Sequence, residues 1–257
     1  MIAVQTIAPR VTNRLRTYNA VAGLVHLLQA IAVLFLTNDF SIPVTAVFME
    51  GPPGTDATKV TTLFDFRIGW GVAVFLLMSA TAHLLLITPG VFQWYVRQLE
   101  TSRNYARWIE YSLSSSLMVV LIALLPGITD ISALIALFGV NAAMILFGLL
   151  MEKYEQPGTP SWTSYWFGVL AGSVPWIAIA FYLWTPGSIA NPPIFVYVIF
   201  VSLFLFFNSF SLNMILQYRQ TWRWRNYLYG EYVYILLSLT AKSLLAWQIF
   251  AGTLAAD

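Results

Sequence analysis

Seven long apolar runs constrain this chain more than any other feature of its sequence. A helix needs about 20 predominantly apolar residues to cross the roughly 30 Å hydrocarbon layer of a membrane. Runs of that length lie at 17–38, 67–89, 106–126, 130–151, 163–185, 193–217 and 226–252. We therefore predict an all-α membrane protein with seven membrane-spanning helices, in which residues 1–257 form a single domain.

The composition supports this class and excludes others. Of the 257 residues, 59% are hydrophobic and only 9% are charged, whereas soluble domains carry about 25% charged residues. The absence of cysteine excludes disulfides, thiolate metal sites and cysteine nucleophiles. We find no glycine-rich phosphate loop, metal-ligand spacing or plausible serine triad. We therefore expect no conventional enzyme, no metal site and no nucleic-acid partner.

The link between the first two runs, at about 39–66, predicts a β-hairpin. The segments SIPVTAVFME and ATKVTTLFDF are rich in β-branched and aromatic residues, and they flank the turn sequence GPPGTD. Two other segments predict helix boundaries. TPG at 88–90 is expected to end the second helix, and TDIS at 129–132 is expected to begin the fourth.

Lysine and arginine predict the orientation of the bundle, because cytoplasmic loops carry an excess of both. The face that holds the N-terminus carries nine of these residues, the opposite face carries Lys59 and Arg67, and Arg107 and Lys242 fall within runs. The nine are Arg10, Arg14, Arg16, Arg97, Arg103, Lys153, Arg219, Arg223 and Arg225. We expect a multi-pass protein of the cell membrane with a cytoplasmic N-terminus, an extracellular C-terminus and an extracellular hairpin.

Lys242 lies in the middle of the last apolar run, where an ammonium group is costly. An ionisable residue within a membrane helix indicates a functional site unless a partner explains it. Glu110 is the candidate partner in the third run, and Arg107 lies three residues before it on the same helix face. Because helical side chains lean toward the helix N-terminus, the Lys242 nitrogen reaches back toward Ser238 and the level of Glu110.

Other polar residues are expected at the same level, in the cytoplasmic half of the bundle. They are His26 with Gln29 in the first run and His83 in the second. Glu231, three turns before Lys242 on the same helix face, is expected at the inner edge of this group. Each has a structural alternative. A buried Lys242–Glu110 pair can serve packing alone, the histidines can be satisfied core residues, and Arg107 and Glu231 can be charges at the headgroup level.

Taken together, these residues resemble the heliorhodopsins, a family of microbial rhodopsins. The resemblance rests on RWIEYS at 107–112, SLTAKS at 238–243, FFNSFSLNMILQY at 206–218, the two histidines and the long hairpin. That family inserts in the inverted orientation, which the count of positive residues predicts independently. The resemblance covers essentially the whole chain.

The resemblance implies a retinal-binding photoreceptor. Lys242 would hold all-trans retinal covalently as a protonated Schiff base, with Glu110 as counterion and Ser238 hydrogen-bonded nearby. Pro175, Trp176 and Phe206 would form walls of the retinal slot. A cluster around His26 and His83, with Gln29, Arg107 and Glu231, would accept the proton after illumination. A homodimer to which the hairpin contributes is also implied.

Two positions bear on the type of rhodopsin. Outward-pumping relatives carry acids one turn before the retinal lysine and three turns after the first carboxylate, where this chain has Ser238 and Leu121. We therefore expect an internal proton transfer, a slow photocycle and no pumping, in a light sensor that an unknown cytoplasmic partner reads. The alternatives are a light-gated proton channel or transporter of the same fold, and a non-photoactive seven-helix scaffold or transporter.

Overall fold

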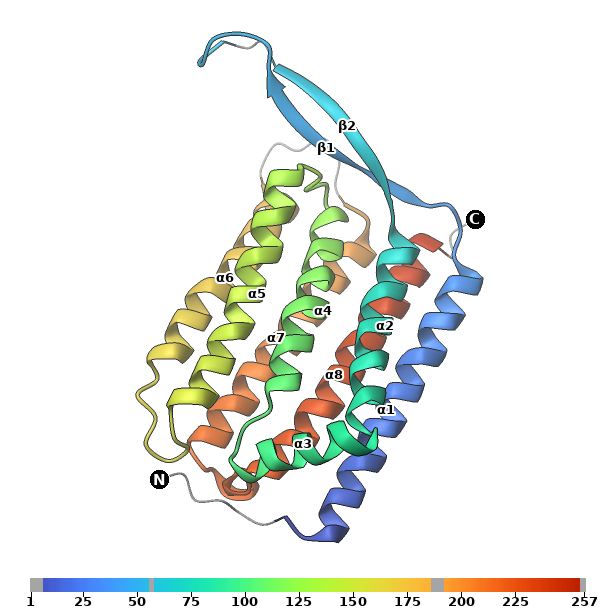
Figure 1. Ribbon diagram of the computed structural model, residues 1–257. Helices are drawn as coiled ribbons and strands as arrows, with labels where there is room; N and C mark the ends of the chain where they lie inside the picture. Colours follow the sequence, from blue (N-terminus) through green and yellow to red (C-terminus); the bar gives the residue numbers. More distant parts are fainter. Residues whose placement is uncertain (1–6, 56–57, 186–191, 255–257) are drawn as a thin grey trace.

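The computed structural model describes residues 7–55, 58–185 and 192–254, and these form a bundle of long helices (Figure 1). Within these ranges, seven helices are long and apolar enough to cross a membrane. They are α1 (Pro9–Leu36), α2 (Ile68–Leu86), α4 (Tyr105–Leu124), α5 (Ile131–Tyr154), α6 (Thr163–Trp184), α7 (Ile194–Tyr218) and α8 (Tyr227–Ile249). The predicted all-α membrane architecture with seven spans is confirmed.

Helix boundaries follow the predicted ones closely, with one exception. Six of the seven helices begin within one residue of the predicted start, and Asp130 caps α5 by accepting hydrogen bonds from the backbone nitrogens of Ser132 and Ala133. The exception is α1, which begins at Pro9 and not at residue 17. The first two turns of α1 carry Arg10, Arg14 and Arg16, which lie before the apolar run. The prediction missed these turns because the part of a helix beyond the hydrocarbon layer does not need apolar side chains. After α8 the chain continues as the short π-helix η2 (Phe250–Leu254).

The predicted hairpin is present after α1. Strands β1 (Ser41–Met49) and β2 (Thr58–Arg67) pair antiparallel from Ser41 opposite Arg67 to Met49 opposite Thr58, with a bulge between Val44 and Thr45. Figure 1 shows the hairpin rising over one end of the bundle. Thr45 fixes it there, because its backbone nitrogen donates to the carbonyl of Thr129 at 2.9 Å, in the turn between α4 and α5. We call this end of the bundle the hairpin end.

A helix that the sequence did not predict, α3 (Pro89–Glu100), lies across the opposite end of the bundle (Figure 1). TPG at 88–90 was expected only to stop α2, but Thr88 also precedes α3 and Pro89 occupies its first position, where a missing backbone N–H has no cost. Tyr95 and Leu99 are buried, and they pack with Leu15 and Leu86. This amphipathic helix closes what we call the α3 end.

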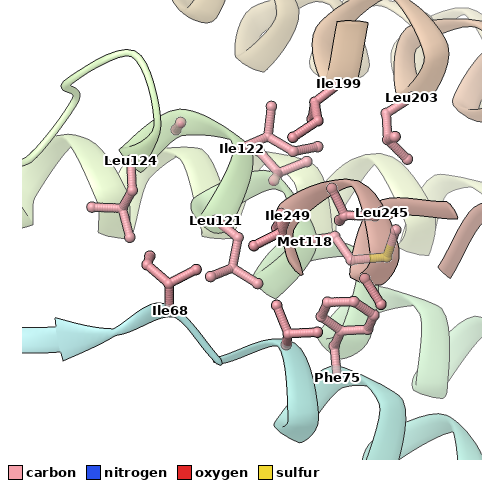
Figure 2. Close-up of a cluster of buried hydrophobic side chains, with 14 of the residues drawn as sticks. Ile68, Phe75, Met118, Leu121, Ile122, Leu124, Ile199, Leu203, Leu245 and Ile249 are labelled. Carbon is pink, nitrogen blue, oxygen red and sulfur yellow. The ribbon is translucent and has the colours of Figure 1, made fainter. Parts of the chain in front are cut away.

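The half of the bundle toward the hairpin end has an apolar core. Figure 2 shows its side chains, contributed by α2, α4, α7 and α8. They include Ile68, Phe75, Met118, Leu121, Ile122, Leu124, Ile199, Leu203, Leu245 and Ile249. Leu121 is fully buried among them, so the position three turns after Glu110 serves helix packing. The buried polar groups described below lie mainly toward the α3 end.

Candidate functional site

Lys242, Glu110 and Ser79 form a closed hydrogen-bonded group between α8, α4 and α2. The Lys242 ammonium donates to Glu110 Oε1 at 2.7 Å and to Ser79 Oγ at 2.6 Å, and Ser79 Oγ donates to Glu110 Oε1 at 2.6 Å. The side chains of Lys242 and Glu110 are only 4% and 9% exposed. The costly ammonium therefore has a carboxylate and a hydroxyl as partners.

Ser79 holds the place that the sequence assigned to Ser238. The Ser238 hydroxyl has no hydrogen-bond partner among the described residues, although the side chain is 1% exposed. It borders a cavity beside Lys242. Ser79 was missed, although it lies one turn before His83 on the same face of α2, and this spacing was the available signal.

A cavity of about 310 Å³ opens beside Lys242 between α4, α5, α6, α7 and α8. Aromatic and apolar side chains make up most of its lining, including Trp108, Tyr111, Met118, Trp176, Phe207 and Phe210. Trp176 packs edge-to-face against Phe200, Phe204 and Phe207, with ring centroids 5.3–5.4 Å apart. The lining of the cavity is therefore mostly apolar, and the Lys242 amine lies on one side of it.

Two of the three predicted wall residues do not border this cavity. Trp176 does, whereas Pro175 and Phe206 are not among the lining residues. The reason is helical rotation: Phe204, Phe207, Asn208 and Ser211 share the face of α7 that borders the cavity, and Phe206 points to another side. Pro175 is buried within α6, one residue before Trp176.

Glycines at the cavity allow α5 to lie close to its neighbours. A Cβ atom at Gly148 would overlap the ring of Trp108, and one at Gly172 would lie 2.9 Å from Met144 Cγ. Real Cβ atoms essentially never approach another heavy atom that closely. These two positions therefore set the shape of the cavity wall.

The two histidines lie side by side near the lysine. Their ring centroids are 5.9 Å apart and the planes are inclined by 16°. His83 Nδ1 lies 2.8 Å from Asn19 Oδ1, whereas neither nitrogen of His26 has a hydrogen-bond partner among the described residues. Gln29, one turn further along α1, accepts a hydrogen bond from Ser243 at 2.9 Å. The two histidine rings thus stack on each other, whereas Gln29 is hydrogen-bonded to Ser243 of α8.

Residues 15–254 match the sequence model of the heliorhodopsin family. The chain belongs to the heliorhodopsin family. The resemblance inferred from the sequence is confirmed, and this heliorhodopsin is a rhodopsin-type, light-sensing, multi-pass membrane protein and not a member of a conventional enzyme family. Membership of a rhodopsin family implies a retinal chromophore in general. No curated protein sequence matches the chain.

A second polar group of this heliorhodopsin lies between the lysine and the α3 end. Arg107 forms ion pairs with Glu152 and Glu231, which are buried with it. Asn104 binds both carboxylates, through its side chain to Glu231 at 2.7 Å and through its backbone nitrogen to Glu152 at 2.8 Å. Tyr227 donates to Glu152 at 3.0 Å. We call these five residues the carboxylate cluster.

The sequence placed Arg107 beside Glu110, but the guanidinium of Arg107 pairs with Glu152 and Glu231. Glu152 was missed, because the predicted span ended at residue 151, and α5 continues through Glu152 to Tyr154. Glu231 pairs with Arg107 at the edge of the polar group toward the α3 end, and it is fully buried, unlike a headgroup-level charge.

A small cavity of about 30 Å³ separates the lysine group from the carboxylate cluster. Residues from both sides line it, among them Asn19, His83, Tyr95, Glu110, Arg107 and Glu231. The volume is enough for about two water molecules, and polar side chains among the lining residues could bind them. Burial, assisted by the nearby Glu231 carboxylate, raises the pKa of the Tyr95 phenol on α3, so this residue presents a neutral hydroxyl group.

Proposed function

We propose that this heliorhodopsin is a light sensor that carries all-trans retinal covalently, as a protonated Schiff base on Lys242, with Glu110 as the counterion. The observation that carries the proposal is the placement of the Lys242 amine, bound to one carboxylate and bordering an apolar cavity. The cavity volume of about 310 Å³ is at the lower end of the range for small-molecule sites. An amine and an apolar slot are the two features that an elongated apolar aldehyde requires.

The residues around Lys242 have different roles in this function. Retinal, when bound, supplies the absorption of visible light and a change of shape. Glu110 supplies the negative charge that stabilises a cation at Nζ, and Ser79 orients both groups through its two hydrogen bonds. Trp176, Phe207 and Tyr111 border the cavity with their rings, and they would exclude water from the slot.

The proton is expected to stay within the protein. Glu110, His83 and residues of the carboxylate cluster border the same small cavity, so a proton released at Nζ has acceptors toward the α3 end. Toward the hairpin end it would meet Leu121 and the apolar core of Figure 2. This arrangement supports an internal transfer with slow return, and it disfavours both pumping and a proton channel. Photocurrents that follow the proton gradient would favour the channel.

We also propose how the protein is placed and with what it associates. The nine basic residues on the N-terminal face favour a cytoplasmic α3 end and an extracellular hairpin. The hairpin exposes Val47, Phe48, Met49, Val60 and Leu63, and such a surface supports a homodimer contact. A separate cytoplasmic protein would read conformational changes at the α3 end, and the chain would act as one retinal-binding domain.

Absorption spectra of membranes supplied with all-trans retinal test the proposal. We expect a visible band in the wild type, the same band in Lys59→Ala, and none in Lys242→Ala. Lys59 is the matched control because its side chain is 64% exposed on β2, away from the bundle. A visible band that survives Lys242→Ala would remove the assignment of Lys242, and no band in any variant would return Lys242 and Glu110 to a structural ion pair.

A further inference from the structure

The side chain of Asn19 has a fixed orientation in the structure. It lies on α1, is 1% exposed, and donates from Nδ2 to the carbonyl of Leu15 at 2.9 Å. A carbonyl oxygen can only accept, so the amide nitrogen must face Leu15 and the amide oxygen must face the other way. The reversed amide would place two acceptors against each other at that distance.

The orientation of Asn19 decides which nitrogen of His83 carries hydrogen. Asn19 Oδ1 lies 2.8 Å from His83 Nδ1, and because Oδ1 can only accept, Nδ1 must be the donor. A neutral imidazole carries one N–H. With Nδ1 protonated, Nε2 therefore holds the lone pair and is the nitrogen that can take up a proton.

The surroundings of His83 suit a proton acceptor. The ring borders the small cavity together with Glu110 and Arg107 of α4, Glu231 of α8 and Tyr95 of α3. His26 of α1 stacks against it. In contrast, His26 has no hydrogen-bond partner among the described residues for either nitrogen, so nothing comparable selects one of its tautomers.

We propose that Asn19 is a positioning residue that holds His83 as the Nδ1–H tautomer, and so leaves Nε2 as the nitrogen that can take up the proton that the proposed function releases at Nζ of Lys242. The tautomer follows from the contacts of Asn19 alone, whereas the role of Nε2 rests on the proposed function. In the transfer, Nζ loses one proton and becomes neutral. The His83 ring then carries a hydrogen on both nitrogens and the positive charge, and Glu110 remains a carboxylate.

Nitrogen NMR in the dark tests the tautomer directly. The chain has only two histidines, so in His26→Gln protein with 15N-labelled histidine, and without a histidine tag, both ring signals belong to His83. We expect a protonated Nδ1 and an unprotonated Nε2, with or without retinal. A protonated Nε2 with a bare Nδ1, or two protonated nitrogens, would each overturn the proposal.

Variants of Asn19 separate positioning from folding. Asn19→Leu removes the acceptor at similar volume, and we expect the preference for Nδ1–H to be lost. Asn19→Asp keeps an acceptor oxygen for Nδ1 and, at a pH at which its carboxyl group is protonated, a hydroxyl donor for the Leu15 carbonyl. Under that condition we expect the Nδ1–H tautomer to be retained. An unchanged tautomer in Asn19→Leu that folds, judged by circular dichroism, would overturn the role of Asn19. If Asn19→Leu does not fold, the wild-type tautomer and Asn19→Asp still decide.

The light-driven role has its own measurement. In retinal-loaded protein, we expect Asn19→Leu to slow the loss of the Nζ proton after a flash on the order of tenfold, and Asn19→Asp to retain most of the rate. An unchanged rate in Asn19→Leu would overturn the role of Nε2. No light response in the wild type would overturn the proposed function, and with it the role of Nε2, while the dark tautomer would still show whether Asn19 positions His83.

Discussion

The hydroxyl of Ser79 accepts a hydrogen bond from Lys242 Nζ at 2.6 Å and donates one to Glu110 Oε1, also at 2.6 Å. The ion pair between α8 and α4 is therefore also tied to α2. Ser238, one turn before Lys242 on α8, borders the same region but has no hydrogen-bond partner among the described residues. The two buried serines thus differ: the Ser79 hydroxyl binds both charged groups, whereas the Ser238 hydroxyl binds none of the described residues.

This difference predicts unequal costs for two alanine substitutions. Ser79→Ala removes hydrogen bonds to two charged groups, and bonds of that kind contribute roughly 1.5–3 kcal/mol each. We expect Ser79→Ala to lower the free energy of unfolding of the retinal-free protein by about 1.5–3 kcal/mol and not by twice that, because the direct bond from Lys242 to Glu110 remains. Ser238→Ala should lower it by under about 1 kcal/mol. Both side chains are almost fully buried, so burial is matched. Equal losses in denaturant titrations would contradict the bonding of Ser79.

Replacing Glu110 with glutamine should change the colour of the retinal-loaded protein. The substitution removes the negative charge that lies 2.7 Å from Nζ, so the positive charge would spread further from the nitrogen. We therefore expect an absorption maximum at longer wavelength. Glu231→Gln is the control, because that carboxylate pairs with Arg107 and not with Lys242, and it should shift the maximum less. A shift to shorter wavelength in Glu110→Gln would indicate another counterion.

Arg107 is the only cation in the carboxylate cluster, and its removal should be costly. Arg107→Gln would leave Glu152 and Glu231 buried beside each other without their ion-pair partner. Breaking a buried pair in this way costs about 3–5 kcal/mol. Arg97→Gln on the exposed face of α3 should stay within about 0.5 kcal/mol of the wild type. Unfolding titrations would check both, and the double variant Arg107→Gln with Glu231→Gln should recover part of the loss.

The sequence predicted those parts of the fold that depend on length and local composition. Six span starts were placed within one residue, because the hydrocarbon thickness sets a minimum length for each apolar run and polar residues mark where the runs begin. The hairpin followed from β-branched runs around a Pro/Gly turn. α3 was missed because its 12 residues are too short to span, and its apolar stripe is visible only when the segment is assumed to be helical.

The level of the site residues was predictable, and so was the pairing of Lys242 with Glu110, but the other contacts were not. Sequence position gives the depth of a residue along a helix, so Lys242, Glu110, His83 and Arg107 were placed in the same half of the bundle. Which side chains meet depends on the rotation of each helix and on neighbours from other segments. For this reason the bonding of Ser79 and Asn19, and the direction of Arg107 toward Glu152, required the structure.

Two glycines of α5 predict opposite effects of the same substitution. A Cβ at Gly148 would overlap the Trp108 ring, whereas a Cβ at Gly139 has no heavy atom within 4 Å. We expect Gly148→Ala to destabilise the protein by roughly 1–3 kcal/mol through overpacking and to weaken retinal uptake, since Trp108 lines the cavity. Gly139→Ala should be neutral or stabilise by up to about 1 kcal/mol through helix propensity. Thermal unfolding of both variants would show whether Gly148 sets the cavity wall.

Single cysteines can test the proposed orientation, because the chain contains none of its own. Lys59 is exposed on β2 at the hairpin end, and Arg223 is exposed in the 3₁₀ helix η1 (Trp222–Arg225) at the opposite end. We expect a membrane-impermeant maleimide to label Lys59→Cys on intact cells and to label Arg223→Cys only after the membrane is opened. The cysteine-free wild type gives the background.

The reverse labelling pattern would contradict the proposed orientation and also the proposed cytoplasmic partner. The carboxylate cluster and His83 lie toward the α3 end, so a proton moved toward that end would then approach the extracellular face. A cytoplasmic partner could not read changes at α3 or η1 in that case, and the hairpin would have to be the surface that signals. Labelling from outside at Lys59→Cys alone would instead leave η1 and α3 facing the cytoplasm, as the nine basic residues predict.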